Sequence, residues 1–302
     1  MWRKWYVLAP RGVVMTAAVL AWVLTQLENG HRVVLASVVD TSGSVPGKAG
    51  ARLAMRSNDH HWTGTVGGAG LEMMVLKESS SMLETHRLAA GKVLTYGLNK
   101  GAKGYEVTPL DSLCGGRVTL SLEVLIPMPH VLLIGGGHCA KAIAPALSAL
   151  GWDHSIHDTR VEFCDHNAFP EAKHHLHMDA QSFVQANDHS TLSMYSDVLF
   201  LGHDWAEDQL RLLGILETLQ SSNSKLDGEH APRIGVIGSR SKWQAFEQAA
   251  LEQGIPQALL DQVVCPIGIQ IGAESPEEIA VAVVAQIMAA HKGVNPSDGS
   301  WR

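Results

Sequence analysis

The chain has 302 residues and a net charge of −7, and 46% of its residues are apolar while 18% are charged. This is the balance of a globular protein with one large domain or two ordinary ones. Because lysine and arginine form no basic domain or stripe, nucleic acid is not expected as the main partner.

The first segment combines early positive charge with an apolar run from Val13 to Leu24. A signal peptide has a similar outline, but no A-x-A-like site follows the run, which continues into TQLENG, a helix end with a C-cap glycine. The run is also shorter than the roughly 20 residues that span a bilayer. We therefore expect a core helix and no membrane segment. Met15 is an alternative start, with residues 1–14 as a poorly ordered extension.

The pattern over residues 1–126 predicts an N-terminal α+β domain, which a Pro-containing linker, IPMPH, closes at 126–130. β-branched and alternating runs indicate strands, and glycine, serine and proline indicate loops. The expected elements are a strand at 33–39, a loop at 41–50, a short strand at 51–55, a helix that begins near Leu71, and strands in YEVTPL and GRVTLSLEVLI.

From residue 131 strands alternate with helices, a pattern typical of a parallel sheet with helices on both faces. We predict an α/β chain whose second domain, 127–302, is a Rossmann-like doubly wound parallel sheet. Pro145 lies inside the first helix of this domain and is expected to kink or shorten it. Ser275 and Glu278 are spaced as a capping box for the last helix, and the tail 294–302 is expected to be mobile.

The sequence GGGHCA follows the first strand of this domain and opens its first helix at His138. Gly135 allows a tight turn, Gly137 allows the backbone to approach a phosphate, and Ala140 allows the helix to pack on the strand. Free amides at such a helix N-terminus bind an anion. Asp158 ends the second strand about 20 residues later, where an acid that binds a ribose belongs. The alternative is that the turn serves packing alone.

The carboxyl ends of the predicted strands should form one crevice, because ligands of open parallel sheets bind there. Arg240 and Lys242 would hold phosphate or another anion. The alternative role for Asp204 and Asp208 is helix capping, and for His203 it is that of a hydrogen-bonded loop histidine. The cofactor-binding residues predicted in this crevice are Gly135, Gly137, His138, Asp158, Arg160, His203, Asp204, Ser239, Arg240 and Lys242.

A second glycine-rich turn, WTGTVGGAGLE, precedes the helix of the first domain. Gly67 and Gly68 in this turn are candidates for a second anion nest, with a plain loop as the alternative. Cys114, in LCGGR, is a further binding candidate because a thiol before two glycines is accessible. The alternative is a small buried apolar residue, the usual fate of a free cysteine.

Metal binding is not predicted. The four cysteines have no CxxC spacing, which excludes a zinc ribbon or a disulfide framework and favours a reducing compartment. The histidines of HHLH, 174–177, include two that would share one strand face, but no matching cysteine or carboxylate set converges with them. Histidines that are exposed on a loop or strand are more common than metal ligands.

Taken together, the motifs resemble the XdhC/CoxI family of accessory proteins for molybdenum hydroxylases over nearly the whole chain. The segments that carry the resemblance are GSVPGKAGARL, GTVGGAGLE, CGGRV, IGGGHCAKAIAPALSALGW, HDTR, GHDWAED, IGVIGSRSKW and CPIGIQIGAESPEEIAVAVVAQI. The chain differs from the family pattern at Gly47, where arginine is usual, and at the turn Gly68–Gly70, where cysteine is frequent. Cys114 is the remaining family-matched cysteine.

The resemblance implies a two-domain cytoplasmic protein that binds the molybdopterin form of the molybdenum cofactor. It also implies support for cofactor sulfuration by a cysteine desulfurase and delivery to xanthine dehydrogenase or a related molybdenum hydroxylase apoenzyme. Members of the family are often homodimers. Such a protein is a maturation chaperone more than an enzyme, and no catalytic residues are assigned.

Two other functions remain compatible with the sequence. An NAD(P)-dependent oxidoreductase would use the glycine turn and Asp158, but no Tyr–Lys pair that could act beside a nicotinamide is recognisable. A regulatory or interaction protein would keep the nucleotide-binding fold without any ligand in the crevice.

Overall fold

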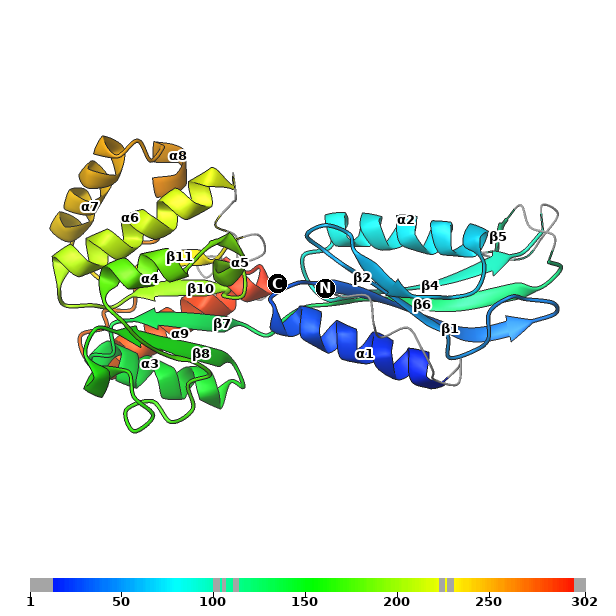
Figure 1. The fold of residues 1–302 in the computed structure, drawn as a ribbon, viewed down its shortest axis with the longest axis horizontal. Coiled ribbons are helices and arrows are strands. Elements are labelled where there is room, and N and C mark those ends of the chain that lie inside the picture. The colour runs from blue at the N-terminus through cyan, green and yellow to red at the C-terminus, as the bar shows by residue number, and fades with distance from the viewer. Residues whose placement is uncertain are drawn as a thin grey trace. The chain divides into compact units, whose positions relative to one another are not determined.

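The structure is a computed structural model that describes residues 13–99, 104, 107–110, 114–222, 226 and 231–295. The chain divides into two compact units, residues 1–127 and 128–302, and each is described by itself (Figure 1). The predicted fold class is confirmed, because the first unit mixes helices with an antiparallel sheet and the second contains a parallel sheet. The expectations for residues 1–12 and 296–302 fall outside the described residues.

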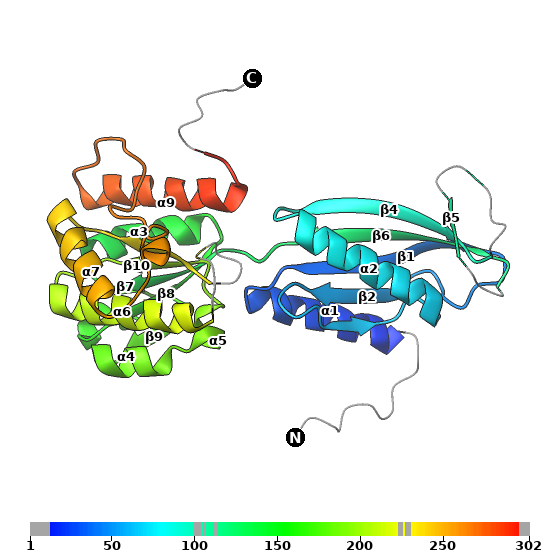
Figure 2. The same ribbon diagram turned by 90° about the horizontal axis from the view of Figure 1, so that it is seen from above.

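Among the described residues of unit 1, six strands form one sheet in the order β3-β2-β1-β6-β4-β5. The β4–β5 pair is parallel and the others are antiparallel. Figure 1 shows α1 and α2 on opposite faces of this sheet, and Figure 2 looks onto the face that α2 covers. The elements are α1 (Val13–Glu28), β1 (Val33–Ser42), β2 (Arg52–Arg56), β3 (Trp62–Gly64), α2 (Ala69–Thr85), β4 (Ala90–Gly97), β5 (Val107–Pro109) and β6 (Arg117–Leu125).

The first helix is a core helix, as predicted. It buries Val19 and Val23 against Val33 of β1 and Ala54 of β2. The chain then leaves the helix through Gly30, whose φ of 80° is the left-handed conformation of a helix C-terminus. The apolar run that resembles a signal peptide is therefore explained by packing against the sheet.

Strand β4 was not predicted from the sequence, nor was the three-residue β3. The burial pattern of β4 changes along its length: Gly91–Val93 are exposed, whereas Tyr96 and Gly97 are buried. Because the strand lacks a regular alternation of apolar and polar residues, its pattern does not indicate a strand. Its pairing with β6 along its whole length fixes it in the sheet.

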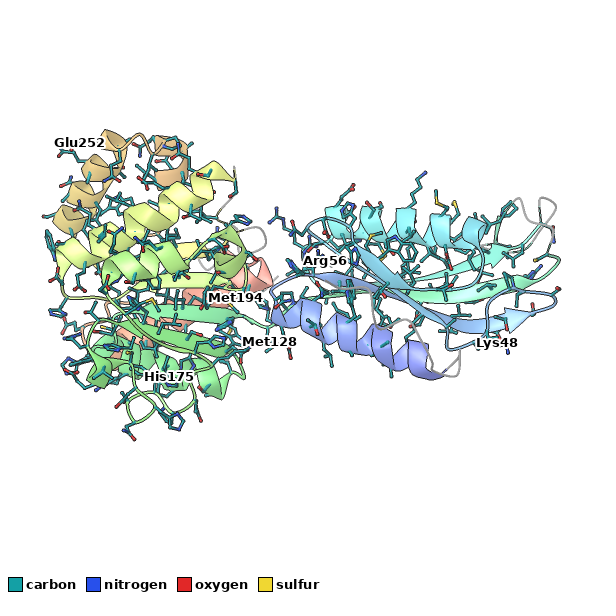
Figure 3. All side chains as sticks on the ribbon, in the orientation of Figure 1. Lys48, Arg56, Met128, His175, Met194 and Glu252 are labelled. Atoms are coloured by element: carbon teal, nitrogen blue, oxygen red, sulfur yellow. The ribbon has the colours of Figure 1, made fainter. Side chains whose placement is uncertain are left out.

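The glycines of the two loops at one end of this sheet lie against each other. A Cβ atom on Gly67 would overlap the backbone of Gly47, and one on Gly47 would overlap the carbonyl of Val66. Figure 3 shows Lys48 in this loop, with Arg56 at the opposite end of the sheet. The glycine-rich turn is therefore required for close backbone packing between the loops.

Unit 2 contains a parallel sheet in the order β11-β10-β7-β8-β9. Within the described residues its strands are β7 (His130–Ile134), β8 (Asp153–Asp158), β9 (His175–His177), β10 (Asp197–Phe200) and β11 (Arg233–Val236). Its helices are α3 (His138–Ala149), the 3₁₀ helix η1 (Val161–Phe163), α4 (Ala180–Ala186), α5 (His189–Leu192), α6 (Trp205–Ser221), α7 (Arg240–Glu252), α8 (Gln257–Leu260) and α9 (Pro276–Lys292).

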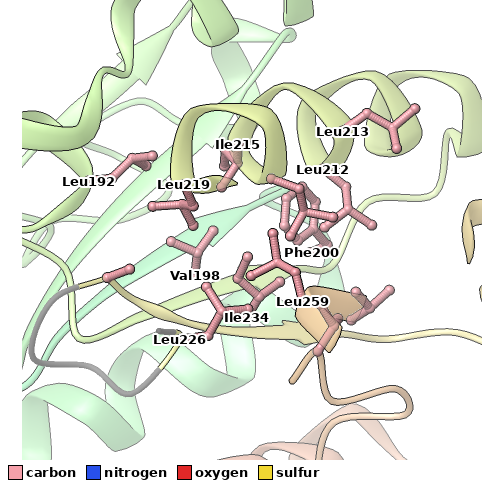
Figure 4. Packing of buried hydrophobic residues seen from close by; sticks show 14 of the residues in the cluster. Leu192, Val198, Phe200, Leu212, Leu213, Ile215, Leu219, Leu226, Ile234 and Leu259 are labelled. Atoms are coloured by element: carbon pink, nitrogen blue, oxygen red, sulfur yellow. The ribbon is translucent and has the colours of Figure 1, made fainter. Parts of the chain in front are cut away.

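Helices cover both faces of this sheet. On one face α6 packs its leucines on β10 and β11, with Val198, Phe200 and Ile234 fully buried beneath them (Figure 4). On the other face α3 and α9 lie side by side. Each face buries a continuous apolar layer, as a doubly wound sheet requires.

Two expectations about the helices of unit 2 have different outcomes. The capping box of Ser275 and Glu278 is confirmed at the start of α9. Pro145 was expected to kink or shorten α3; the shortening does not occur, because the helix continues through it to Ala149. The proline ring faces solvent, so water can reach the carbonyl that loses its amide partner.

A single methyl group tests the loop packing of unit 1. Gly67→Ala should lower the free energy of unfolding by about 2 kcal/mol or more, because φ is +101° and the Cβ would overlap Gly47. The matched control is Gly70→Ala, in open space at the start of α2, which should raise stability by up to about 1 kcal/mol. Urea denaturation of the whole chain measures both. Equal effects of the two variants would contradict the packing argument.

Candidate functional site

The chain reverses its direction of sheet growth beside β7. It adds β8 and β9 on one side and then returns to place β10 and β11 on the other. A ligand crevice is expected at such a switch point, beyond the carboxyl ends of the strands. A small pocket lies there; it is lined by Gly135, Asp158, Thr159, Arg160, Gly202, His203, Asp204, Glu207, Asp208 and Arg211.

The three glycines after β7 have three different surroundings. Gly135 has a φ of +98°, and a Cβ on it would lie 2.7 Å from the backbone of Gly202 after β10. A Cβ on Gly136 would overlap the carbonyl of Phe163. At Gly137, by contrast, nothing lies within 4 Å of the Cβ position. The first two glycines permit close backbone packing, and only the third faces open space.

The N-terminus of α3 is open to an anion. Gly137 is its N-cap and supplies no side-chain hydrogen bond, and the first turn contains no acidic residue. The backbone amides that begin a helix have no partners within it, and the helix dipole favours negative charge beside them. Lys141 in the same turn adds a cation, which lies over the ring of Phe163. This is the geometry of a phosphate site.

Asp158 does not present a free carboxylate. Its oxygens accept hydrogen bonds from the amide of Gly136 at 2.9 Å, and from the amide, Nε and Nη2 of Arg160. A carboxylate has about four acceptor positions, so these donors use its capacity. Burial works to raise the pKa of Asp158, but the hydrogen bonds from Arg160 and Gly136 outweigh it and lower the pKa. Asp158 therefore fastens the glycine turn to Arg160.

Asp208, which lines the pocket, belongs to a buried ion pair. Nζ of Lys242 on α7 lies 2.9 Å from Oδ2 of Asp208 on α6, and both side chains are at least 96% buried. Oδ1 of Asp208 has no hydrogen-bond partner; Nη1 of Arg211 lies 3.8 Å away. Burial raises the pKa of Asp208, while the charges of Lys242 and Arg211 act in the opposite direction.

Arg211, which also lines the pocket, is bound to a buried histidine. Its Nε donates to Nε2 of His157 at 2.9 Å, and its Nη2 donates to Glu207 at 2.7 Å. His157 lies against the carbonyl of Leu176 through Nδ1 and stacks on Phe183. Since Nε2 accepts from a guanidinium, His157 must be the neutral tautomer that carries its proton on Nδ1. Burial is the main cause that lowers the pKa of His157 to about 4.

The residues predicted at the strand ends divide into two groups. Gly135, Asp158, Arg160, His203 and Asp204 line the pocket together. Asp204 also has the alternative role of a helix cap, since its side chain accepts hydrogen bonds from the amides of residues 206 and 207 at the start of α6.

The second group does not line the pocket. His138 and Arg240 are exposed, and Ser239 is the N-cap of α7. Lys242 was predicted to hold an anion, but its ammonium is bound to Asp208 and to the carbonyls of residues 202 and 237. Asp208 in turn is not a helix cap, so that alternative is wrong.

Glu207 and Arg211 of α6 were overlooked in the sequence. Together with Asp208, they have the i,i+3 and i,i+4 spacing of ion-paired helix neighbours. This spacing could have been recognised in the sequence, because it lies at the start of the helix that follows β10 and Gly202. That Arg211 is buried, and that its partner is His157, depends on the packing of α6 on the sheet.

The predicted binding residues of unit 1 pack against other parts of the unit. Gly67 lies against Gly47, and Gly68 against Pro46. Cys114 is half-buried and packs against the core of the unit. In unit 2, His175 (labelled in Figure 3) has Nε2 2.8 Å from the carbonyl of Phe169. Within the part of the chain that the structure describes, no cluster of three or more potential metal ligands occurs.

The parallel sheet covered by helices on both faces defines a protein with a Rossmann-type unit. Two family models match the chain: one described as "XdhC Rossmann domain" over residues 131–287, and one described as "XdhC and CoxI family" over residues 26–97. The first alone covers half of the chain, so the chain belongs to the XdhC and CoxI family.

Two curated relatives are similar to the chain. The uncharacterized protein YqeB of Escherichia coli (strain K12) is 29% identical over 84% of this chain and 42% of its own length. A probable xanthine dehydrogenase subunit from Bacillus subtilis (strain 168) is 27% identical over 57% of this chain and 46% of its own length. The chain spans less than half the length of these relatives.

A solved structure, that of a xanthine dehydrogenase from Bacillus halodurans, covers 93% of this chain and 98% of its own at 18% identity and a TM-score of 0.45. This likeness is too weak to carry a conclusion. Among the described residues, no helix is long and apolar enough to cross a membrane.

The buried histidines make unit 2 sensitive to acid. Burial lowers the pKa of His130 and of His157 to about 4, so each binds its proton more weakly in the folded than in the unfolded state. Stability should be constant above pH 6.5 and fall between about pH 6.5 and 4, where only the unfolded chain is protonated. The loss approaches about 3 kcal/mol for each histidine.

Urea denaturation at several pH values measures this loss. His130→Phe replaces a ring that packs edge-on against Tyr195 with one that cannot be protonated. This variant should show a shallower fall between pH 6.5 and 4. An unchanged slope would mean that other groups cause the acid sensitivity.

Proposed function

We propose that this protein binds the molybdenum cofactor in its molybdopterin form and serves as a maturation chaperone for a molybdenum hydroxylase of the xanthine dehydrogenase type. The observation that carries the proposal is the open N-terminus of α3, which begins at Gly137 with uncapped amides and open space above them. Molybdopterin ends in a phosphate, and such a helix N-terminus binds phosphate. Membership of the XdhC and CoxI family supports the choice of cofactor.

The two regions of the crevice differ in charge. The α3 terminus has no acidic side chain in its first turn and suits the phosphate. The pocket beside it is lined by four carboxylates and two guanidinium groups. Because acidic groups outnumber basic ones there, an anion is disfavoured in the pocket, and the phosphate is assigned to the α3 terminus.

The alternative, an NAD(P)-dependent oxidoreductase, has less support from the geometry. A dinucleotide site of this type uses the acid at the end of the second strand to bind a ribose hydroxyl. Here that acid is Asp158, and Arg160 together with two backbone amides uses its acceptor positions. A ribose would have to displace Arg160, which also lies 3.8 Å from the ring centre of Phe163.

The proposal includes partners and a place in the cell. The cofactor would pass to a xanthine dehydrogenase-type apoenzyme, after sulfuration by a cysteine desulfurase, in the cytoplasm. The proposal also includes a homodimer of this chain, because members of the family that it resembles are often homodimers. The names of curated relatives, one of them a probable xanthine dehydrogenase component, support the choice of the apoenzyme.

A single charge tests the phosphate site. Gly137 has a φ of −73° and no atom near its Cβ position, so Gly137→Glu is compatible with the backbone. The new carboxylate would occupy or repel the anion at the α3 terminus. Molybdopterin retained by the protein from a producing host, quantified by native mass spectrometry, should fall at least tenfold.

The matched control is Ala149→Glu, which adds the same charge at an exposed position at the far end of α3. It should retain the cofactor as the unchanged protein does. If Gly137→Glu also retains it, the phosphate does not bind at this turn. If the unchanged protein never contains molybdopterin and transfers none to an apo-hydroxylase, the proposed function is wrong.

A further inference from the structure

The outer face of α1 is apolar although it is exposed. From residue 16 to the last turn, the exposed residues of the helix are Ala17, Ala18, Leu20, Ala21 and Leu24. Leu24 is 62% exposed. Within the helix no charged residue precedes Glu28, its last residue. A helix that is apolar all round is normally buried, so this face is expected to be covered in the assembled protein.

Other surfaces of unit 1 include the polar groups that α1 lacks. On the opposite face of the sheet (Figure 1), α2 exposes, besides the apolar Met73, the side chains of Lys77, Ser81 and Glu84. On the face of the sheet where α1 lies, β6 presents between its buried residues Thr119, Ser121 and Glu123. Both surfaces thus have groups that face water, whereas the exposed residues of α1 before its last turn have none.

The exposed residues of α1 form a seam that is complementary to itself. Ala17, Ala21, Leu24 and Glu28 are separated by four, three and four residues, the spacing that places side chains on one side of a helix. In two such helices packed antiparallel around Ala21, Leu24 of each copy lies against Ala17 of the other. A large residue opposite a small one fills the space between two helices. Such a face suits a two-fold contact with a second copy.

The charges of α1 favour the same antiparallel pair. Its one charged residue, Glu28, lies at the C-terminus, and the helix has no acidic residue in its first turn and no basic residue in its last. Because a helix is positive at its N-terminus and negative at its C-terminus, Glu28 is disfavoured by its own helix. In an antiparallel pair, Glu28 of each copy lies beside the N-terminus of the other helix, where an acid is favourable.

We propose that the outer face of α1 is the contact surface of a homodimer, in which the α1 helices of two copies pack antiparallel with Ala21 at the two-fold axis. This inference rests on the proposed function only in that a homodimer belongs to it, and it shares no residue with the phosphate site at Gly137. A contact between two helices of this length is small for a permanent interface, so we expect a dissociation constant in about the micromolar range.

A single charge in the seam tests the contact. Analytical ultracentrifugation of the full chain at a series of concentrations should show a reversible equilibrium between monomer and dimer. Leu24→Lys should raise the dissociation constant at least about tenfold, because the dimer would bury an unpaired charge. Leu24 is exposed in the single chain, so the variant is compatible with the fold. The matched control is Ser81→Lys on the exposed side of α2, which should change the dissociation constant less than about twofold.

Two further variants test the antiparallel arrangement. Glu28→Lys places a cation at the C-terminus of its own helix, so it should stabilise the monomer, yet it should raise the dissociation constant at least about threefold because it meets the N-terminus of the partner helix. A merely structural role of Glu28 would not give these opposite effects. Ala21→Cys should form a disulfide between copies under mild oxidation, since a residue at the two-fold axis lies against itself. Ser81→Cys and the unchanged chain should not.

The outcomes separate this inference from its alternatives. A chain that is monomeric at every concentration overturns it, as does a dimer that Leu24→Lys leaves intact or that Ala21→Cys does not cross-link. If Leu24→Lys instead lowers the free energy of unfolding of a monomer, another part of the same chain covers the face. Binding to vesicles of phosphatidylcholine and phosphatidylglycerol that Leu24→Lys abolishes, without a dimer, would assign the face to a lipid surface.

The dimer and the proposed function can also fail separately. The ultracentrifugation and cross-linking experiments contain no molybdopterin, so a dimer that depends on Leu24 supports this inference whether or not the protein binds the cofactor. Molybdopterin that co-purifies with a chain that never dimerises overturns the contact at α1 and leaves the phosphate site at Gly137 in place.

Discussion

The close approach of Gly135 and Gly202 determines the arrangement of the Rossmann unit. These glycines end β7 and β10, the two strands between which the sheet changes its direction of growth. Any side chain at Gly135 would collide with the backbone of Gly202, and any side chain at Gly202 would collide with Asp208. Because neither has one, the N-terminus of α3 and the start of α6 lie at one crevice.

Within that crevice, charge is divided between two regions. The α3 terminus offers backbone amides without a capping side chain, whereas the pocket beside α6 is dominated by carboxylates. The arginines of the pocket are largely committed to the chain's own acids and to His157. The α3 terminus is complementary to a phosphate, and this is the physical basis of the proposed function.

Glycine-rich turns in the two units have similar sequences but different surroundings. In unit 1 the glycines at 47 and 67 lie against each other, so their lack of side chains is explained by contact between loops. In unit 2 the first two glycines of GGGHCA have the same explanation, and only Gly137 borders open space. Counting glycines could not separate these cases, because both kinds of contact exclude a Cβ atom.

Residue patterns alone predicted the fold class, the parallel character of the second sheet, the glycine turn on α3 and the capping box of α9, since these follow from local periodicity and short-range spacing. They also indicated several pocket residues, because the ends of parallel strands share one edge. How two of the buried charged groups are paired became evident only from the packed fold: Lys242 is bound to Asp208, and Arg211 reaches His157. These partners are 34 and 54 residues apart in the chain, and whether they meet depends on how α6 and α7 pack on the sheet, which no local pattern specifies.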